Sequence, residues 1–124
     1  MQITIKTIPH KKQRYATCGD WIVEDGNVNI FVSELGDWRE EMLIAYHELR
    51  EALLCIHRGI LQELVDAFDR EYEQNREKGD TSEPGDNRNA PYFMEHQLAS
   101  RDELLLAHDL GVDWEKYGEH IDNL

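Results

Sequence analysis

The stretch WREEMLIAYHELREALLCIHRG, residues 38–59, decides how this chain is interpreted. Its apolar residues recur at helical spacing and predict a helix from Trp38 to about residue 57, which Gly59 ends. One face of this helix carries Met42, Ala45, Leu49, Ala52, Leu53 and Ile56. The opposite side also has apolar residues, and a helix of this kind is usually enclosed between two layers. His47 and Glu51 lie one turn apart on that second side, so we expect them to be at least partly buried.

The segment before this helix predicts a small sheet. Residues 2–8 alternate polar and apolar side chains, as a strand does, and Pro9 stops the pattern. Residues 15–33 predict a hairpin whose turn is Asp25-Gly26. The predicted fold class is therefore α+β: a small N-terminal antiparallel sheet of two or three strands, within about residues 2–33, packed on a helix bundle.

The segment after it predicts further helices in a single domain, residues 1–124. A helix over about 60–76 would bury Leu61, Leu64, Val65, Phe68 and Tyr72. The break at Gly59 is short, so we expect an antiparallel helical hairpin that brings Asp66 and Asp69 beside Glu51 and His47. A polar loop over 77–90 precedes helices over about 91–110 and 113–121. Within the first of these, Ser100 and Glu103 have capping-box spacing, which by itself explains Glu103.

Composition restricts the possible partners. The chain of 124 residues has a formal net charge of −13, which disfavours direct binding to nucleic acid or to an acidic membrane. No apolar run is long enough to span a membrane or to form a signal peptide, so we expect a cytoplasmic protein. Cys18 and Cys55 fit no metal spacing and are expected to be free thiols. A non-catalytic role remains open, in which the acidic surface occupies a basic partner protein.

Residues 47–51 form the pattern H-E-x-x-E. Side chains four apart on a helix can reach one cation, and the Glu between them can activate water beside it. This is the logic of the H-E-x-x-H zinc hydrolases, which take a third ligand from elsewhere. Here Glu51 replaces the second His, which makes the site more anionic and makes Mn²⁺, Mg²⁺ or iron plausible beside Zn²⁺. As a purely structural feature, a His-Glu pair would stabilise the helix by only about 0.2–0.5 kcal/mol.

Residues 27–73 resemble the compact zincin metallopeptidases of phages and bacteria, the ImmA/IrrE type. In that family a strand and a short arginine-containing loop lead into a helix of the form A-H-E-L-x-H-x-L-L, and the next helix supplies an acidic third ligand. The resemblance implies that His47 and Glu51 bind a divalent metal (Zn, Mn or Mg) and that Glu48 is the catalytic base. It implies Asp66 as third ligand, and His96 is a further candidate because it follows the polar loop. The substrate would be a peptide or a small molecule.

A second resemblance predicts a different enzyme. Glu48 and Glu51, followed by Glu63 and Asp66, are similar to the E-x-x-E … E-x-x-D pattern of MazG-type nucleotide pyrophosphohydrolases. Four carboxylates on two antiparallel helices there hold Mg²⁺ against a nucleoside triphosphate. That fold is all-helical, whereas the first third of this chain predicts strands, so this alternative ranks second. The oligomeric state is not indicated by the sequence.

Overall fold

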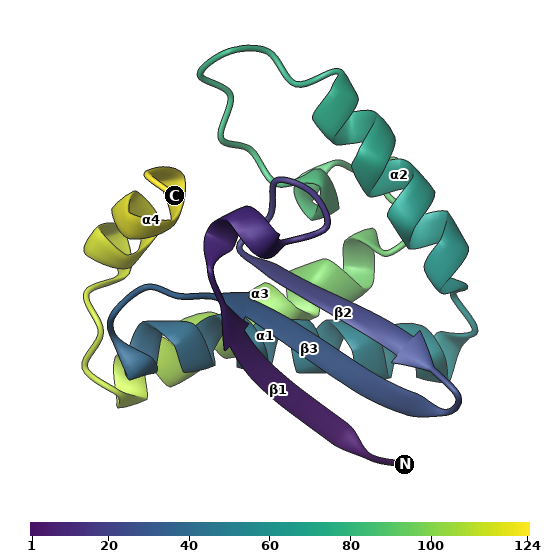
Figure 1. Ribbon diagram of the computed structural model, residues 1–124, viewed down its shortest axis with the longest axis horizontal. Coiled ribbons are helices and arrows are strands. Elements are labelled where there is room, and N and C mark those ends of the chain that lie inside the picture. Colours follow the sequence, from purple (N-terminus) through teal and green to yellow (C-terminus); the bar gives the residue numbers. More distant parts are fainter.

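The computed structural model describes residues 1–124 and has an α+β fold with its sheet at the N-terminus (Figure 1). The strands are β1 (Ile3–Ile8), β2 (Gly19–Glu24) and β3 (Asn27–Ser33). The helices are α1 (Trp38–Arg58), α2 (Gln62–Gln74), α3 (Phe93–Asp109) and α4 (Trp114–Asp122), with short 3₁₀ turns η1 (His10–Lys12) and η2 (Pro84–Asp86). The predicted fold class is thus confirmed. No helix is both long and apolar enough to cross a membrane.

The sheet is mixed, with strand order β1-β3-β2. β2 and β3 form the predicted antiparallel hairpin, and its turn residues Asp25 and Gly26 both have positive φ. β1 instead pairs parallel to β3, so the expectation of a purely antiparallel sheet was wrong in this detail. β1 and β2 are the two edge strands, and β3 lies between them. In this central strand Val28, Ile30 and Val32 are fully buried.

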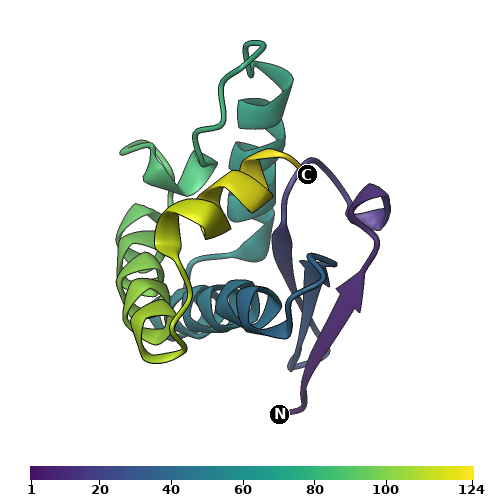
Figure 2. The ribbon, with the colours of Figure 1, turned by 90° about the vertical axis from the view of Figure 1, so that its left-hand side faces the viewer.

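α1 lies between the sheet and α3, as Figure 2 shows. The two helices run antiparallel, since Arg50 pairs with Asp102 and Arg58 pairs with Glu95. The predicted enclosure of α1 is confirmed, but its best-buried side is the one with Leu43, Ile44, His47 and Glu51. On the side expected to form the core, Ala45 and Ala52 are buried as predicted, whereas Ile56 is exposed. The polar side chains at 47 and 51 therefore lie inside the molecule.

α2 does not form a helical hairpin with α1. It rises steeply from the end of α1 (Figures 1 and 2), and it packs against η2. Leu61 and Leu64, expected in the core, are 60% and 55% exposed, whereas Val65 and Asp69 are buried. The predicted face is thus right for Val65 and in part for Phe68 and Tyr72, but wrong for the two leucines, and the buried side includes an acidic residue.

The C-terminal third of the chain contains α3 and α4, which form the remaining side of the molecule. α3 is one continuous helix, so Glu103 lies in its interior and the predicted capping box is wrong. Gly111, which follows α3, has positive φ, and the Asp113 side chain caps α4. Tyr117 of α4 is buried against the other elements. Cys18 and Cys55 are free, as predicted.

Candidate metal centre

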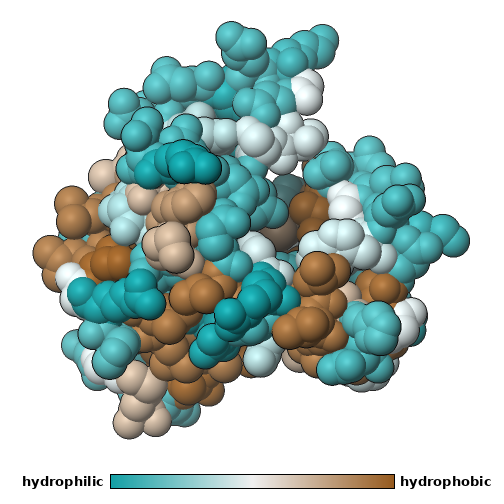
Figure 3. All heavy atoms as spheres, turned by 180° about the vertical axis from the view of Figure 1, so that it is seen from behind, coloured by the Kyte–Doolittle hydropathy of each residue, from teal (hydrophilic) through white to brown (hydrophobic).

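A cavity of about 340 Å³ lies among the loop before β2, α1, α2, the segment 80–85, α3 and the end of α4. The face in Figure 3 is hollowed between the upper part of the molecule and the part formed by α4. Ten of the 30 residues that line the cavity are Asp or Glu. Such a lining attracts cations and repels phosphates.

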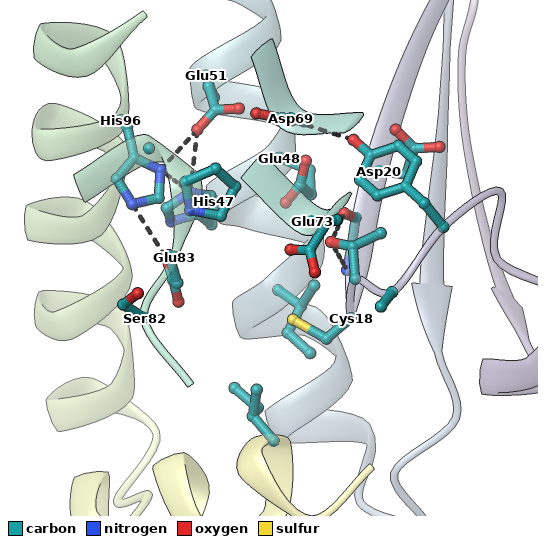
Figure 4. Close-up of a pocket in the computed structure, with 18 of the residues that line it drawn as sticks. Cys18, Asp20, His47, Glu48, Glu51, Asp69, Glu73, Ser82, Glu83 and His96 are labelled. Atoms are coloured by element: carbon teal, nitrogen blue, oxygen red, sulfur yellow. Dashed lines mark hydrogen bonds and ion pairs between the residues drawn. The ribbon is translucent and has the colours of Figure 1, made fainter. Parts of the chain in front are cut away.

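Three side chains converge in this cavity (Figure 4). His47 Nε2 lies 3.2 Å from Glu51 Oε2 and 3.2 Å from His96 Nδ1, and His96 Nδ1 lies 2.9 Å from the same Glu51 oxygen. All three residues are buried. Two come from one turn of α1, and the third comes from the first turn of α3, which the antiparallel packing brings opposite. We call His47, Glu51 and His96 the inner cluster.

Contacts behind the inner cluster fix which atoms face inward. The Nδ1 atom of His47 lies 2.8 Å from Glu103 Oε1, and Glu103 Oε2 accepts a 2.6 Å hydrogen bond from the Tyr117 hydroxyl. On the other side, Trp21 Nε1 donates to Glu51 Oε1 at 2.9 Å. With Nδ1 and Oε1 engaged in this way, His47 Nε2 and Glu51 Oε2 are left for a shared occupant. A carboxylate behind a histidine is the usual arrangement at metal ligands.

The inner cluster holds protons in the metal-free protein. Burial opposes charge on His47, but hydrogen bonds to Glu103 and Glu51 outweigh it and raise its pKa well above the usual value. Burial likewise opposes charge on His96, yet Glu51 and Glu83 raise its pKa to about 10. Burial would raise the pKa of Glu51, but the two histidines lower it to about 2. A cation that binds here must therefore displace protons from the histidines.

Glu48 lines the same cavity and makes no hydrogen bond to the protein. Its side chain packs over Gly19 at the start of β2, where an added Cβ would lie 2.8 Å from Glu48 Oε1. Burial, reinforced by the charge of Glu51, raises its pKa well above the ordinary value of 4.5. A carboxylate that is free of partners and has a raised pKa beside such a cluster is suited to accept and return a proton.

Asp66 is not brought to the inner cluster. Both of its oxygens accept hydrogen bonds from Arg14, which also binds Asp20. Asp69 is held by the hydroxyl groups of Tyr15 and Tyr92, and burial raises its pKa to about 7 despite these bonds. The structure thus places His96, and neither aspartate, with His47 and Glu51. Because α2 diverges from α1 and Glu63 is exposed, the four-carboxylate arrangement is not formed either.

Sequence reasoning missed several residues of the site. Glu103, Trp21 and Tyr117 hold the inner cluster but come from three separate elements, and no local spacing connects them. The i,i+7 interval from His96 to Glu103 places both on one face of α3. This interval was the one feature of the sequence that could have linked Glu103 to the site. The prediction that Glu103 caps a helix had already given that residue another role.

The inner cluster fits a divalent metal ion. Ligand atoms on a tetrahedral ion with bonds of about 2.1 Å lie about 3.4 Å apart, and neighbouring ones on an octahedral ion lie about 3.0 Å apart. The observed separations of 2.9–3.2 Å are close to both values. Two histidines and one carboxylate are the protein ligands of many catalytic zinc sites and of mononuclear iron sites. Comparison with family models, with curated proteins and with solved structures found no match.

Proposed function

We propose that this protein is a divalent-metal-dependent hydrolase of zincin-like build. His47, Glu51 and His96 hold the ion, with His96 in place of the Asp66 that the resemblance implied, and Glu48 is the base. The observation that carries the proposal is the convergence of three buried ligand atoms, each 2.9–3.2 Å from the others, in a cavity that opens to the surface. Two of these ligands are oriented from behind, by Glu103 and by Trp21.

The bound ion would supply Lewis acidity, which polarises a carbonyl group and lowers the pKa of water. The chain's own residues would do the rest. Glu48 accepts a proton from the attacking water at one carboxylate oxygen and returns it to the leaving group. Its raised pKa suits this exchange, because a carboxylate of ordinary acidity holds a proton poorly near neutral pH.

The cavity lining restricts the substrate. With ten carboxyl-bearing residues around it, a phosphate ester or nucleotide would be repelled. An amide or ester, neutral or positively charged near the reacting bond, is compatible with this field. A peptide or a small acylated molecule is therefore the proposed substrate class.

Three proteins test the proposal: the wild type, Glu48→Gln, and the double variant His47→Ala/Glu51→Ala. Each is loaded with Zn²⁺ or Mn²⁺, dialysed, and analysed for metal content and for hydrolysis of peptide and ester libraries. Glu48→Gln should keep the metal and lose hydrolysis, whereas the double variant should lose both. Glu71→Gln, an exposed substitution on α2 outside this cavity, is the control. A wild type that retains no metal would refute the proposal and favour the non-catalytic role.

A further inference from the structure

The imidazole of His96 has a second polar edge that faces away from the inner cluster. Its Nε2 atom lies 2.9 Å from Glu83 Oε2 and 3.3 Å from Asp86 Oδ1. The ligand atoms of these three residues all lie within 4.8 Å of one another. Figure 4 shows Glu83 on the side of His96 opposite to Glu51. We call His96 Nε2, Glu83 and Asp86 the outer cluster.

The Nε2 atom of His96 is buried and has no hydrogen-bond partner, and it is the sole buried side-chain nitrogen or oxygen of the chain in that position. Both carboxylates lie within ion-pair distance of Nε2 and favour the charged ring, but neither places an oxygen along the N–H direction. His47 differs, since its rear nitrogen is satisfied by Glu103. A buried nitrogen aimed between two carboxylates without a hydrogen bond is unusual in a folded protein.

The loop that carries Glu83 and Asp86 packs closely against the imidazole ring of His96. A Cβ at Gly85 would lie 2.4 Å from the His96 ring, so only glycine allows this approach. Asp86 Oδ1 also accepts a hydrogen bond from Gln97 Nε2 of α3 at 3.0 Å. Packing and hydrogen bonding therefore hold the outer cluster in place, although Glu83 and Asp86 are themselves exposed.

We propose that the outer cluster is a second divalent-cation site, which shares the His96 imidazole with the inner one. One nitrogen and two carboxylate oxygens, with room for water on the exposed side, suit Mn²⁺ or a similar ion. In an octahedral site the metal lies along the lone-pair direction of each ligand atom, and neighbouring ligand atoms lie to the side of that direction. This arrangement accounts for two carboxylates that are close to Nε2 but do not lie along its N–H bond.

Occupation of both sites has a defined proton balance. With one ion at Nδ1, the neutral imidazole keeps its remaining proton on Nε2. Binding of a second ion at Nε2 would require that proton to leave for solvent, so that each ring nitrogen could hold one ion. The outer ion would also join η2 to α3 and so fix the segment 83–86 against one wall of the cavity. The inference rests on the proposed function only in the shared use of His96.

Mn²⁺ binding to the metal-free, full-length protein tests the inference. Equilibrium dialysis followed by elemental analysis counts the ions bound to the wild type, to Glu83→Gln/Asp86→Asn, to Glu51→Gln, and to Glu71→Gln/Glu77→Gln. The last variant changes the net charge as much as the first but lies outside both clusters. We expect two ions in the wild type and in this control, and one ion in each of the other two variants.

The outcomes separate the two sites. If Glu83→Gln/Asp86→Asn binds Mn²⁺ with the same stoichiometry and affinity as the wild type, the outer site is refuted and its carboxylates merely neighbour His96. If the wild type binds one ion that is lost in Glu51→Gln, the inner site stands alone and the outer one is refuted. If one ion is bound, survives Glu51→Gln and is lost with Glu83 and Asp86, the outer site stands while the inner one fails.

Discussion

Replacing Glu51 with glutamine in the metal-free protein should lower the pKa of His96 by about two units or more. The pKa of His96 is raised from 6.5 to about 10, with Glu51 the largest contributor and Glu83 the next. This rise corresponds to roughly 5 kcal/mol of preference for the charged ring. Glu51 should account for more than half of it, about 3 kcal/mol, because it forms the more buried of the two contacts.

An NMR titration that follows the imidazole signals of the histidines measures this change in the pKa of His96 directly. The exposed His108 lies outside the cavity and provides an internal control. Unfolding by urea gives a second measurement. A raised histidine pKa contributes stability that is complete below about pH 6.5 and is lost as the pH rises through about 10. The metal-free wild type should therefore lose stability across this window, and Glu51→Gln should lose less. A His96 signal that titrates at the same pH in both proteins would refute the reasoning.

Three further substitutions have defined outcomes. Glu103→Gln removes the charged acceptor behind His47 and should weaken Zn²⁺ or Mn²⁺ binding about 10–100-fold in a chelator competition assay; unchanged affinity would show that Glu103 does not support the ligand. Asp69→Asn should flatten the dependence of stability on pH. Because the pKa of Asp69 is raised to about 7, this residue should lower the free energy of unfolding of the wild type by up to about 4 kcal/mol as the pH rises from about 4 to 7. Urea unfolding curves recorded at these two pH values would detect the loss. Gly85→Ala should destabilise the fold by about 1–3 kcal/mol, because its Cβ would overlap the His96 ring. Gly118→Ala, where the Cβ meets nothing within 4 Å, should cause no loss of thermal stability.

The central helix could be predicted well because its signals are local. Its apolar period, the Gly59 stop and the H-E-x-x-E spacing all lie within one continuous segment. The β2–β3 hairpin could be predicted for the same reason, since the Asp25-Gly26 turn determines it. The partner of β1 could not, because alternation identifies a strand but does not specify which edge it joins or in which direction.

The orientation of α2 was mispredicted for a physical reason. Periodicity placed Leu61 and Leu64 inside together with Val65, but only Val65 is buried, and Asp69 and part of Asp66 turn inward in place of the leucines. Their burial is possible only because Arg14 and Tyr15, about fifty residues earlier, neutralise or bind Asp66 and Asp69. The third member of the inner cluster depends in turn on how α3 packs on α1. Such pairings between distant segments have no local signature in a single sequence.

The contact between Trp21 and Glu51 has a practical consequence. The indole is 4% exposed and donates directly to a residue of the inner cluster, whereas Trp38 and Trp114 are 64% and 42% exposed. An aqueous quencher such as iodide would suppress the emission of the two exposed indoles and leave the buried one. The remaining fluorescence would then respond to occupancy of the inner cluster, so the chain carries its own optical probe and needs no added label.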